Sequence, residues 1–424
     1  MYKNQITDVI SMMRRALNTL DYRLIDHGER VAYIVLKLFE KDVNYSHEQL
    51  VKICYLTLFH DIGAYKTEDL DALTNSDSLF QFEVAQTIHH SIYGFLFLKE
   101  HEFFEEFADA VLFHHLFYDK LLETDCMNKE IASAIFLADR LDMLMMRGRV
   151  KTPTQAIDFL RNGVFNQKLA YLLGELEEEE GTITKVLDRS YLRELVDFLN
   201  NIKPNSKRTQ ALVHILPHAI DFRSEHTVTH TTATVKISVM LANYCGLTEE
   251  EVTNVYLGAL LHDVGKISVT TAILEKDSKL SDNEFNAMKD HVVLTEYILH
   301  GCVSEQVLHI ASRHHEKLDG TGYPKKITEK ELTLADRIVA VGDILSALMG
   351  KRSYKDPFPE EKVKAIVMDL AENGKLCKEV INQAMIHYKE LEESVAIVSD
   401  EAVNKYEQSQ IEAKNLLQKY EGYY

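Results

Sequence analysis

The sequence is poor in residues that interrupt helices and in residues that cross-link chains. Its 424 residues include no tryptophan, six prolines and 17 glycines. Between them, long stretches carry apolar side chains at the 3.6-residue spacing of a helix, which predicts a mostly helical protein. The five cysteines are odd in number, and none lies close to another in the sequence. This usage favours reduced thiols over a disulfide framework.

Positive charge and long apolar runs are also scarce. The formal net charge is −19, which argues against binding of a nucleic-acid polymer or an anionic membrane, because both require basic protein surface. No apolar run approaches the roughly 18 residues of a membrane-spanning helix, and residues 1–20 lack the apolar core of a signal peptide. We therefore expect a cytoplasmic protein without membrane or nucleic-acid partners, which must offer any anionic substrate a local basic pocket.

What the chain does contain is an internal repeat of polar landmarks. Two amphipathic segments, residues 46–63 and 248–265, each begin with a helix-capping residue and end in a His-Asp pair followed by glycine. The equivalent positions around the pairs are His27 and His230, His60-Asp61 and His262-Asp263, His90 and His291, His114-His115 and His314-His315, and Asp139 and Asp343. Their separation drifts only from 200 to 204 residues, which indicates an internal duplication.

The duplication and the chain length together predict an all-α protein of two tandem helical bundle domains. We expect an N-terminal domain over residues 1–150 and a helical connector over residues 151–222. A C-terminal domain is expected over residues 223–424, ending in further helices.

The second set of landmarks has the chemistry of a metal centre. Gly322 and Pro324 break any helix that follows His314 and His315, which places both imidazoles at a helix end. Helices of a bundle can direct distant histidines and carboxylates toward one point, and such ligands suit Fe, Mn, Zn or Ni. The set is too large for one ion, so we expect a cluster of two or more, bridged by Asp263. A hydroxide held by two cations attacks phosphate esters without a serine or cysteine nucleophile, and a phosphodiester fits best.

Residues 223–356 resemble the HD-GYP subfamily of the HD-domain metal-dependent phosphohydrolases. The resemblance depends on His230, the run HDVGK from His262 to Lys266, His291, the run HHEKLDGTGYP, and Asp343 within LADRIVAVGDILSAL. It implies two or three divalent ions, with Fe or Mn preferred. The metal ligands that it implies are His230, His262, Asp263, His291, His314, His315 and Asp343. His226, one helical turn before His230, is a further candidate ligand, and a structural role fits it as well.

The same resemblance implies the substrate contacts. These residues are Lys266, Gly322, Tyr323, Pro324, Arg352 and Lys355. Asp263 and Lys266 are the implied catalytic residues, the first as the metal bridge and the second as a partner of a substrate phosphate near the leaving group. Arg352 and Lys355 would supply the positive patch that an acidic protein must provide locally. The implied reaction is hydrolysis of cyclic di-GMP to linear pGpG, with GMP as a further product.

Two departures from the family pattern concern the surroundings of the ligands. Thr295 replaces the glycine that usually follows His291 by four residues, and we expect a mild change at a helix contact. Ser346 stands where an aspartate is common after Asp343, and we expect altered support of the metal ligands.

The first half of the chain keeps the ligand types but not the loop. Its candidate ligands are His27, His60, Asp61, His90, His114, His115 and Asp139. Ala64 stands where the second half has Lys266, and no Asp-Gly-x-Gly-Tyr-Pro run follows His115. Three interpretations stay open: a metal-binding regulatory domain without catalysis, a hydrolase with another substrate, and a structural relic.

Other functions fit parts of the pattern. A hybrid 3'3'-cyclic GMP-AMP is an alternative substrate, because base preference depends on details of the pocket. A low-turnover signalling protein that binds a nucleotide is an alternative of another class. A nucleotide phosphohydrolase of the wider HD group is a third, although it leaves the GYP run unexplained. A homodimer is a candidate assembly.

Overall fold

The computed structural model describes residues 9–19, 27–65, 87–200, 206–223, 227–276, 278–350 and 357–424. These residues form helices joined by loops, together with an isolated β-bridge between Asp319 and Thr328. The predicted all-α class is confirmed. No helix in the described ranges is both long and apolar enough to cross a membrane.

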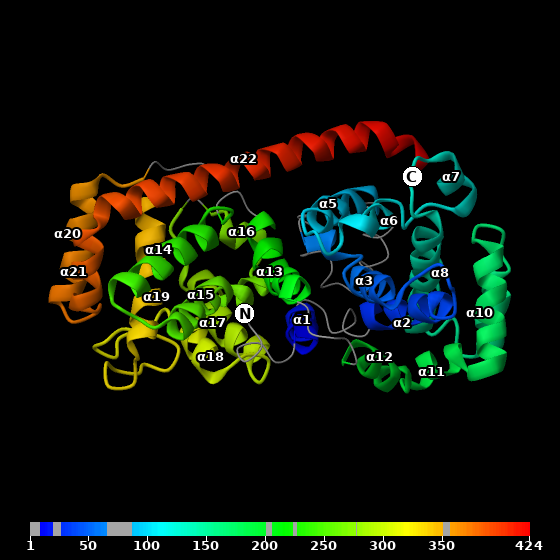
Figure 1. Cartoon of the computed structure of the whole chain (residues 1–424), viewed down its shortest axis with the longest axis horizontal. Helices are drawn as coiled ribbons and strands as arrows, with labels where there is room; N and C mark the ends of the chain where they lie inside the picture. Colours follow the sequence, from blue (N-terminus) through cyan, green and yellow to red (C-terminus); the bar gives the residue numbers. More distant parts are fainter. Residues whose placement is uncertain are drawn as a thin grey trace. The chain divides into compact units, whose positions relative to one another are not determined.

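The chain divides into two compact units, whose helices are labelled in Figure 1. The C-terminal unit contains the first helix, α1, and residues 212–410. The N-terminal unit contains the chain from α2 to residue 211, together with residues 411–424. The helices of the predicted connector, residues 151–222, are therefore shared between the two units. The long helix α22 (Tyr388–Tyr420) contributes its first part to one unit and its last turns to the other.

The N-terminal unit is built around α2, which is buried along nearly its whole length and packs against α3 and α8. The helices of this unit are α2 (His27–Phe39), α3 (His47–Leu58), η1 (Ile62–Tyr65), α5 (Thr87–Lys99), η3 (Glu105–Phe107), α6 (Asp109–Leu112), α7 (Tyr118–Glu123), α8 (Lys129–Met146), α9 (Pro153–Leu160), α10 (Gln167–Glu180), α11 (Thr182–Asp188) and α12 (Tyr191–Asn200), with η5 (Glu421–Tyr423) at the end of the chain.

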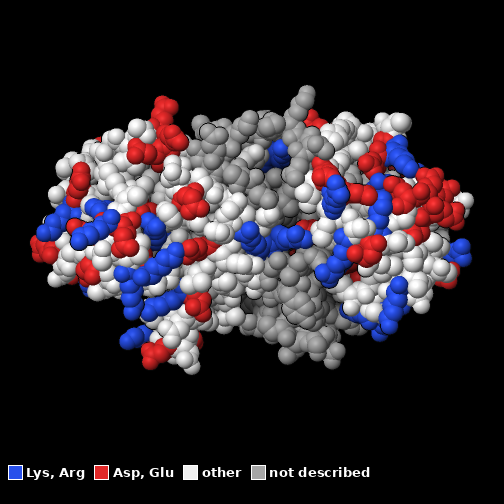
Figure 2. All heavy atoms as spheres, turned by 90° about the horizontal axis from the view of Figure 1, so that it is seen from below, with Lys and Arg blue, Asp and Glu red and all other residues white. Residues whose placement is uncertain are grey.

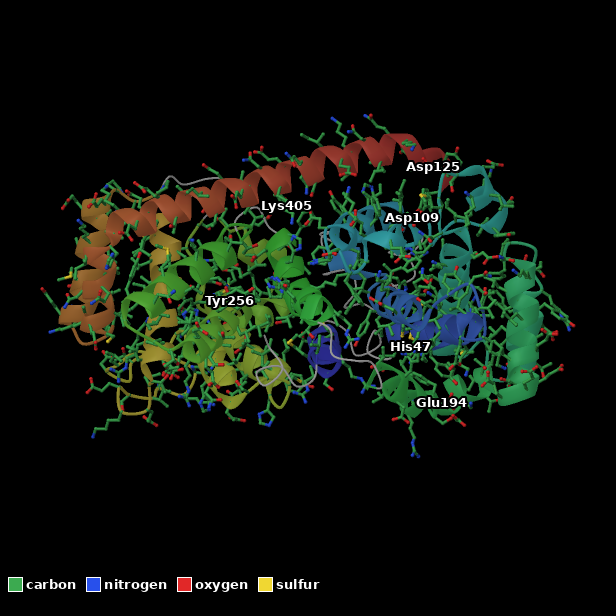
Figure 3. All side chains as sticks on the ribbon, in the orientation of Figure 1. His47, Asp109, Asp125, Glu194, Tyr256 and Lys405 are labelled. Carbon is green, nitrogen blue, oxygen red and sulfur yellow. The ribbon has the colours of Figure 1, made fainter. Side chains whose placement is uncertain are left out.

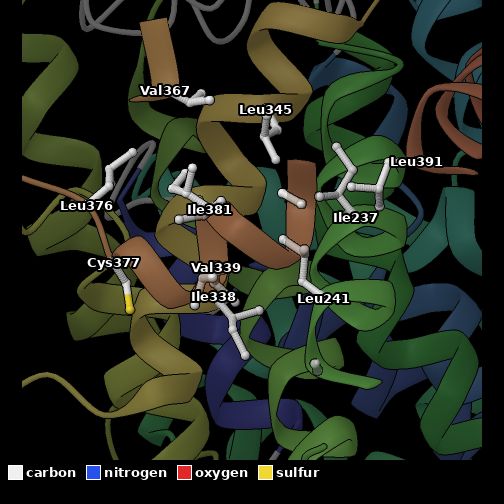
Figure 4. Packing of buried hydrophobic residues seen from close by; sticks show 14 of the residues in the cluster. Ile237, Leu241, Ile338, Val339, Leu345, Val367, Leu376, Cys377, Ile381 and Leu391 are labelled. Atoms are coloured by element: carbon white, nitrogen blue, oxygen red, sulfur yellow. The ribbon is translucent and has the colours of Figure 1, made fainter. Parts of the chain in front are cut away.

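The C-terminal unit repeats the arrangement with α14, α15 and α19 packed together. Its helices are α1 (Val9–Asn18), α13 (Ser206–Arg223), α14 (His230–Tyr244), α15 (Glu249–Leu261), η4 (Val264–Ser268), α16 (Thr271–Leu274), α17 (Asp282–Leu299), α18 (Glu305–Ser312), α19 (Leu334–Met349), α20 (Glu360–Glu372), α21 (Lys378–Ile386) and the first part of α22. The first residues of α13 belong to the N-terminal unit. Figure 4 shows how α14, α19, α20, α21 and α22 fill one hydrophobic core, with Ile237, Leu345 and Leu391 fully buried. Removing such side chains from water is the main stabilising contribution to the bundle.

The helices that carry the His-Asp pairs begin where the sequence predicts. The backbone N–H of Gln49 donates to the Ser46 hydroxyl (3.3 Å), and the Gln49 side chain accepts from the Ser46 N–H (3.1 Å). Thr248 and Glu251 repeat this exchange at 3.4 and 2.9 Å. Each reciprocal cap pairs N–H groups that the helix start leaves open. The caps therefore define where α3 and α15 start, and each helix ends beside its His-Asp pair.

Polar contacts hold the termini of the described chain within their units. In the N-terminal unit, Asp125 accepts hydrogen bonds from the Tyr420 hydroxyl (2.5 Å) and from Lys419 (2.7 Å); Figure 3 labels Asp125. In the C-terminal unit, Arg15 of α1 donates to the backbone oxygen of Tyr297 (3.2 Å) near the end of α17, where carbonyls lack helical partners. Basic and acidic side chains are interspersed on the face in Figure 2, with acidic ones gathered where α10 lies.

Candidate metal centres

Five segments bring the seven predicted ligands of the C-terminal unit together. α14 begins with His230, α15 is followed by His262-Asp263, α17 carries His291, the loop after α18 carries His314-His315, and α19 carries Asp343. Their side chains are largely buried, from 0% exposed at His262 to 25% at His315. Ligand atoms in each of three overlapping groups lie within 4.8 Å of one another. The structure therefore gathers all seven side chains.

Backbone hydrogen bonds orient the buried imidazoles. The Nδ1 atoms of His262, His291 and His314 lie 2.7, 2.5 and 2.7 Å from the carbonyl oxygens three residues earlier. A carbonyl only accepts, so each Nδ1 carries the proton and each Nε2 keeps its lone pair. That tautomer is the one that a metal ion at Nε2 requires.

The two oxygens of Asp263 face different sets of histidines. Oδ2 lies 3.4 Å from His230 Nε2 and 3.1 Å from His262 Nε2. Oδ1 lies 3.2 Å from His291 Nε2 and 3.9 Å from His314 Nε2. We call the two regions the first and second sub-sites. The first sub-site contains His230, His262, Asp263 Oδ2 and Asp343, and the second contains Asp263 Oδ1, His291, His314 and His315.

The donor set fits divalent cations. His262 Nε2 and Asp263 Oδ1 are buried and have no hydrogen-bond partner in the described part of the unit. Such buried unpaired atoms are costly, and a cation in each sub-site would satisfy them. Nitrogen and carboxylate oxygen together are the ligands of borderline divalent metals.

The protonation of the histidines fits the same interpretation. Burial lowers the pKa of His314 well below its ordinary value and lowers that of His315 to about 3, so both rings keep lone pairs. His230 differs, because hydrogen bonds to Asp263 and Asp343 outweigh burial and raise its pKa to about 9. Metal binding at His230 would therefore displace a proton.

Lys266 lies beside the bridge. Its Nζ is 2.5 Å from Asp263 Oδ2. Although burial opposes the charged form, His262 and Lys266 hold the pKa of the Asp263 carboxyl well below its ordinary value. The carboxylate is therefore ionised and available as a ligand at neutral pH.

The glycine after the His-Asp pair allows η4 to approach α17. A Cβ atom on Gly265 would lie 1.9 Å from the backbone oxygen of His291. The Thr295 hydroxyl accepts from the Gly265 N–H and donates to the backbone oxygen of His262, both at 3.0 Å. Thr295, expected to be only a mild change at a helix contact, thus ties the ligand loop to α17.

The GYP loop covers one edge of the second sub-site. The Tyr323 ring lies 4.8 Å from the His315 ring, and a Cβ on Gly322 would lie 2.4 Å from Cα of Glu316. Lys289 lies over the Tyr323 ring at 5.2 Å. Sequence reasoning missed Lys289, although its position two residues before His291 places it on the same helix. The predicted residues His226, Arg352 and Lys355 lie outside the described residues.

The N-terminal unit builds a similar centre from its own seven predicted ligands. Asp61 Oδ2 lies 3.6 Å from His27 Nε2 and 3.4 Å from His60 Nε2, and Oδ1 lies 3.6 Å from His90 Nε2 and 3.7 Å from His114 Nε2. Asp139 Oδ1 lies 3.3 Å from His27 Nε2, and His115 lies beside Asp139. The same division into a first and a second sub-site therefore applies.

The support of the first histidine differs between the centres. In the N-terminal unit, Asp142 accepts from His27 Nδ1 at 2.7 Å and also pairs with Arg30. In the C-terminal unit, Ser346 holds the equivalent place, 3.1 Å from His230 Nδ1. The expected change at Ser346 is thus a hydroxyl in place of a carboxylate. Sequence reasoning missed Asp142, which its spacing of three from Asp139 could have revealed.

Comparisons with known proteins place these centres in a family context. Two models of the HD domain, a metal-dependent domain, match residues 24–144 and 214–372. The chain is 27% identical to the 3'3'-cGAMP-specific phosphodiesterase 1 of Vibrio cholerae over 390 residues, 87% of this chain and 88% of that protein. It is 31% identical to the cyclic di-GMP phosphodiesterase of Thermotoga maritima over 230 residues, 54% of this chain and 59% of the relative.

A solved structure supports the fold. The crystal structure of a cyclic GMP-AMP specific phosphodiesterase of V. cholerae, V-cGAP3, superposes with a TM-score of 0.53 and covers 92% of this chain and 99% of that one. At 18% sequence identity, this likeness concerns the fold alone.

Proposed function

The chain belongs to the HD-domain family, with two HD domains in tandem, and on that premise we propose that its C-terminal unit is a metal-dependent phosphodiesterase that opens a cyclic dinucleotide. The observation that carries this proposal is that the two carboxylate oxygens of Asp263 face separate sets of histidines. One carboxylate placed in this way can bridge two cations.

The residues have distinct roles in this proposal. Divalent ions bound here would supply Lewis acidity and a deprotonated water. Asp263 holds the two sub-sites at a fixed separation, and the Nε2 atoms of His262 and His291 supply lone pairs. Lys266, 2.5 Å from Asp263, places an ammonium where it can donate to a phosphate oxygen or to the leaving oxygen. Tyr323 offers an aromatic face beside the second sub-site.

For the cofactor we propose two or three ions, with Fe or Mn preferred. The first sub-site would hold one ion through two histidines and two aspartates, and the second would hold another through three histidines and Asp263. Lengths of metal bonds and the number of bound waters would follow from spectroscopy of the loaded protein.

For the substrate we propose cyclic di-GMP, hydrolysed to linear pGpG and further to GMP. The second candidate is 3'3'-cyclic GMP-AMP, which is favoured by a relative of that name that matches over both HD domains. In each of these molecules two phosphodiester groups join the two nucleotides, so the same metal chemistry can hydrolyse either one. The base contacts would decide between them.

The test is incubation of the full chain with each cyclic dinucleotide in Mn²⁺ or anaerobic Fe²⁺, with products separated by chromatography. We expect linear dinucleotide from the wild type, and none from Asp263→Ala, which also loses metal. A higher kcat/KM for cyclic GMP-AMP would replace the first substrate by the second. Tight binding of a nucleotide by metal-loaded protein without any linear product would replace the enzyme by a signalling sensor. The predicted homodimer and cytoplasmic location remain predictions.

A further inference from the structure

The N-terminal centre contains a cation of its own, the guanidinium of Arg140. Its Nη2 lies 2.7 Å from His115 Nδ1 and 3.3 Å from Asp139 Oδ2. Arg140 follows Asp139 on α8, whereas the residue that follows Asp343 in the C-terminal unit is Ile344. A permanent positive charge therefore lies beside the second sub-site of one unit, and an apolar residue takes the equivalent place in the other.

The contact with Arg140 decides which nitrogen of His115 carries the proton. Arginine donates hydrogen bonds and never accepts them, so His115 Nδ1 is the acceptor and the neutral ring is protonated at Nε2. His115 Nε2 lies 2.6 Å from His90 Nε2 and donates to it. The chain of hydrogen bonds from Arg140 through His115 to His90 thus occupies two imidazole lone pairs of the second sub-site.

The histidines of the first sub-site, His27 and His60, lie outside this chain of hydrogen bonds, although Arg140 is also 3.3 Å from Asp139 of that sub-site. His27 Nε2 and His60 Nε2 are buried without a hydrogen-bond partner among the described residues. His27 Nδ1 is held by Asp142, and His60 Nδ1 donates to the backbone oxygen of Thr57 at 2.8 Å. His60 therefore presents a free Nε2 lone pair, and His27 Nε2 faces the carboxylates of Asp61 and Asp139.

We infer that the N-terminal unit holds a single divalent ion, in its first sub-site, and that Arg140 keeps the second sub-site closed to another cation. A guanidinium remains charged at any pH the protein meets, so Arg140, in contact with His115, repels a second cation from this sub-site. A single ion cannot share a bridging hydroxide with a second ion. The N-terminal unit also has Ala64 at the position equivalent to Lys266, so it lacks that lysine. Of the three interpretations of this domain, metal binding without the C-terminal reaction is favoured.

The experiment counts metal ions in the full chain with the C-terminal centre removed by His262→Ala and Asp263→Ala. The protein is loaded with Mn²⁺, desalted and measured by elemental mass spectrometry and electron paramagnetic resonance. We expect about one ion per chain with the spectrum of an isolated Mn²⁺. Adding Arg140→Leu should raise the count to about two and produce the spectrum of a coupled pair.

Two controls locate the ion and isolate the effect of charge. Asp61→Ala in the same background should remove the remaining metal. Arg149→Leu removes an exposed arginine shortly after the same helix and should leave the count unchanged.

Several outcomes would overturn the inference. They are about two ions while Arg140 is intact, no ion at all, or an unchanged count in folded Arg140→Leu protein. If Arg140→Leu protein does not fold, the spectrum of protein that keeps Arg140 still tests whether the N-terminal unit holds a single ion. In a chain with an intact C-terminal centre, Arg140→Leu should leave cyclic dinucleotide hydrolysis unchanged. Failure of the inference is therefore distinct from failure of the proposed function, which would appear as no hydrolysis by the wild type.

Discussion

Replacement of Lys266 by methionine separates the two tasks of the C-terminal centre, binding metal and stabilising phosphate charge. Lys266 Nζ and Asp263 Oδ2 are 2.5 Å apart, and their side chains are 16% and 8% exposed. At an effective dielectric constant of 20, the attraction between unit charges at this distance is about 7 kcal/mol before the loss of hydration is subtracted. After that loss, a charged hydrogen bond typically contributes about 1.5–3 kcal/mol.

Two measurements follow for Lys266→Met. In metal-free protein the Asp263 carboxylate loses its counter-charge, so the free energy of unfolding should fall by about 1.5–3 kcal/mol. In metal-loaded protein the ions take over this role, so metal content should be unchanged. Hydrolysis should nevertheless slow by about 10²–10³-fold in kcat, the typical cost of removing one donor from a developing negative charge.

The assays are urea unfolding with and without metal, elemental analysis, and chromatography of linear dinucleotide. Lys276→Met is the matched control, because Lys276 pairs with Glu284 at 2.6 Å and touches none of the predicted ligands in the contacts that the structure describes. An unchanged kcat in Lys266→Met would refute the placement of the substrate phosphate beside Lys266. Loss of metal together with activity would mean that Lys266 supports the ligands instead.

Three further perturbations test the geometry of the centres. Gly265→Ala should destabilise the protein by about 3 kcal/mol in urea unfolding, because its Cβ would lie 1.9 Å from a backbone oxygen. The control Gly174→Ala adds a methyl group that meets open space on α10, and it should stabilise the protein by about 0.5–1 kcal/mol. Equal effects of the two substitutions would contradict the close approach at Gly265. Asp142→Asn should weaken metal affinity of the N-terminal centre about 10–100-fold in chelator competition, because the amide supports His27 less well, and an unchanged affinity would contradict that support. Burial raises the pKa of Asp221 from 3.8 to about 8, so its stabilising contribution is complete below pH 4 and is lost as the pH rises to about 8. The unfolding free energy of metal-free Asp221→Asn should therefore change less over that range than the wild type, and equal slopes would count against the shift.

The ligand types could be predicted from the sequence because chemistry and spacing are local properties. The sequence alone shows the His-Asp pairs, the capping residues Ser46 and Thr248 and the near-constant offset of the repeat. They predict the helical class, the helix starts and the fourteen side chains that the structure gathers into two centres.

The sequence could not show how these side chains divide among metal ions. The opposite faces of Asp263, the hydroxyl link of Thr295 and the place of Arg140 depend on distances between helices far apart in the chain. In the sequence, Arg140 is an ordinary arginine that follows Asp139. Only the structure places its guanidinium 2.7 Å from His115. Residue identity alone therefore determined which groups can bind a cation, whereas packing alone decided which of their lone pairs remain free, because a hydrogen bond is a matter of tenths of an ångström.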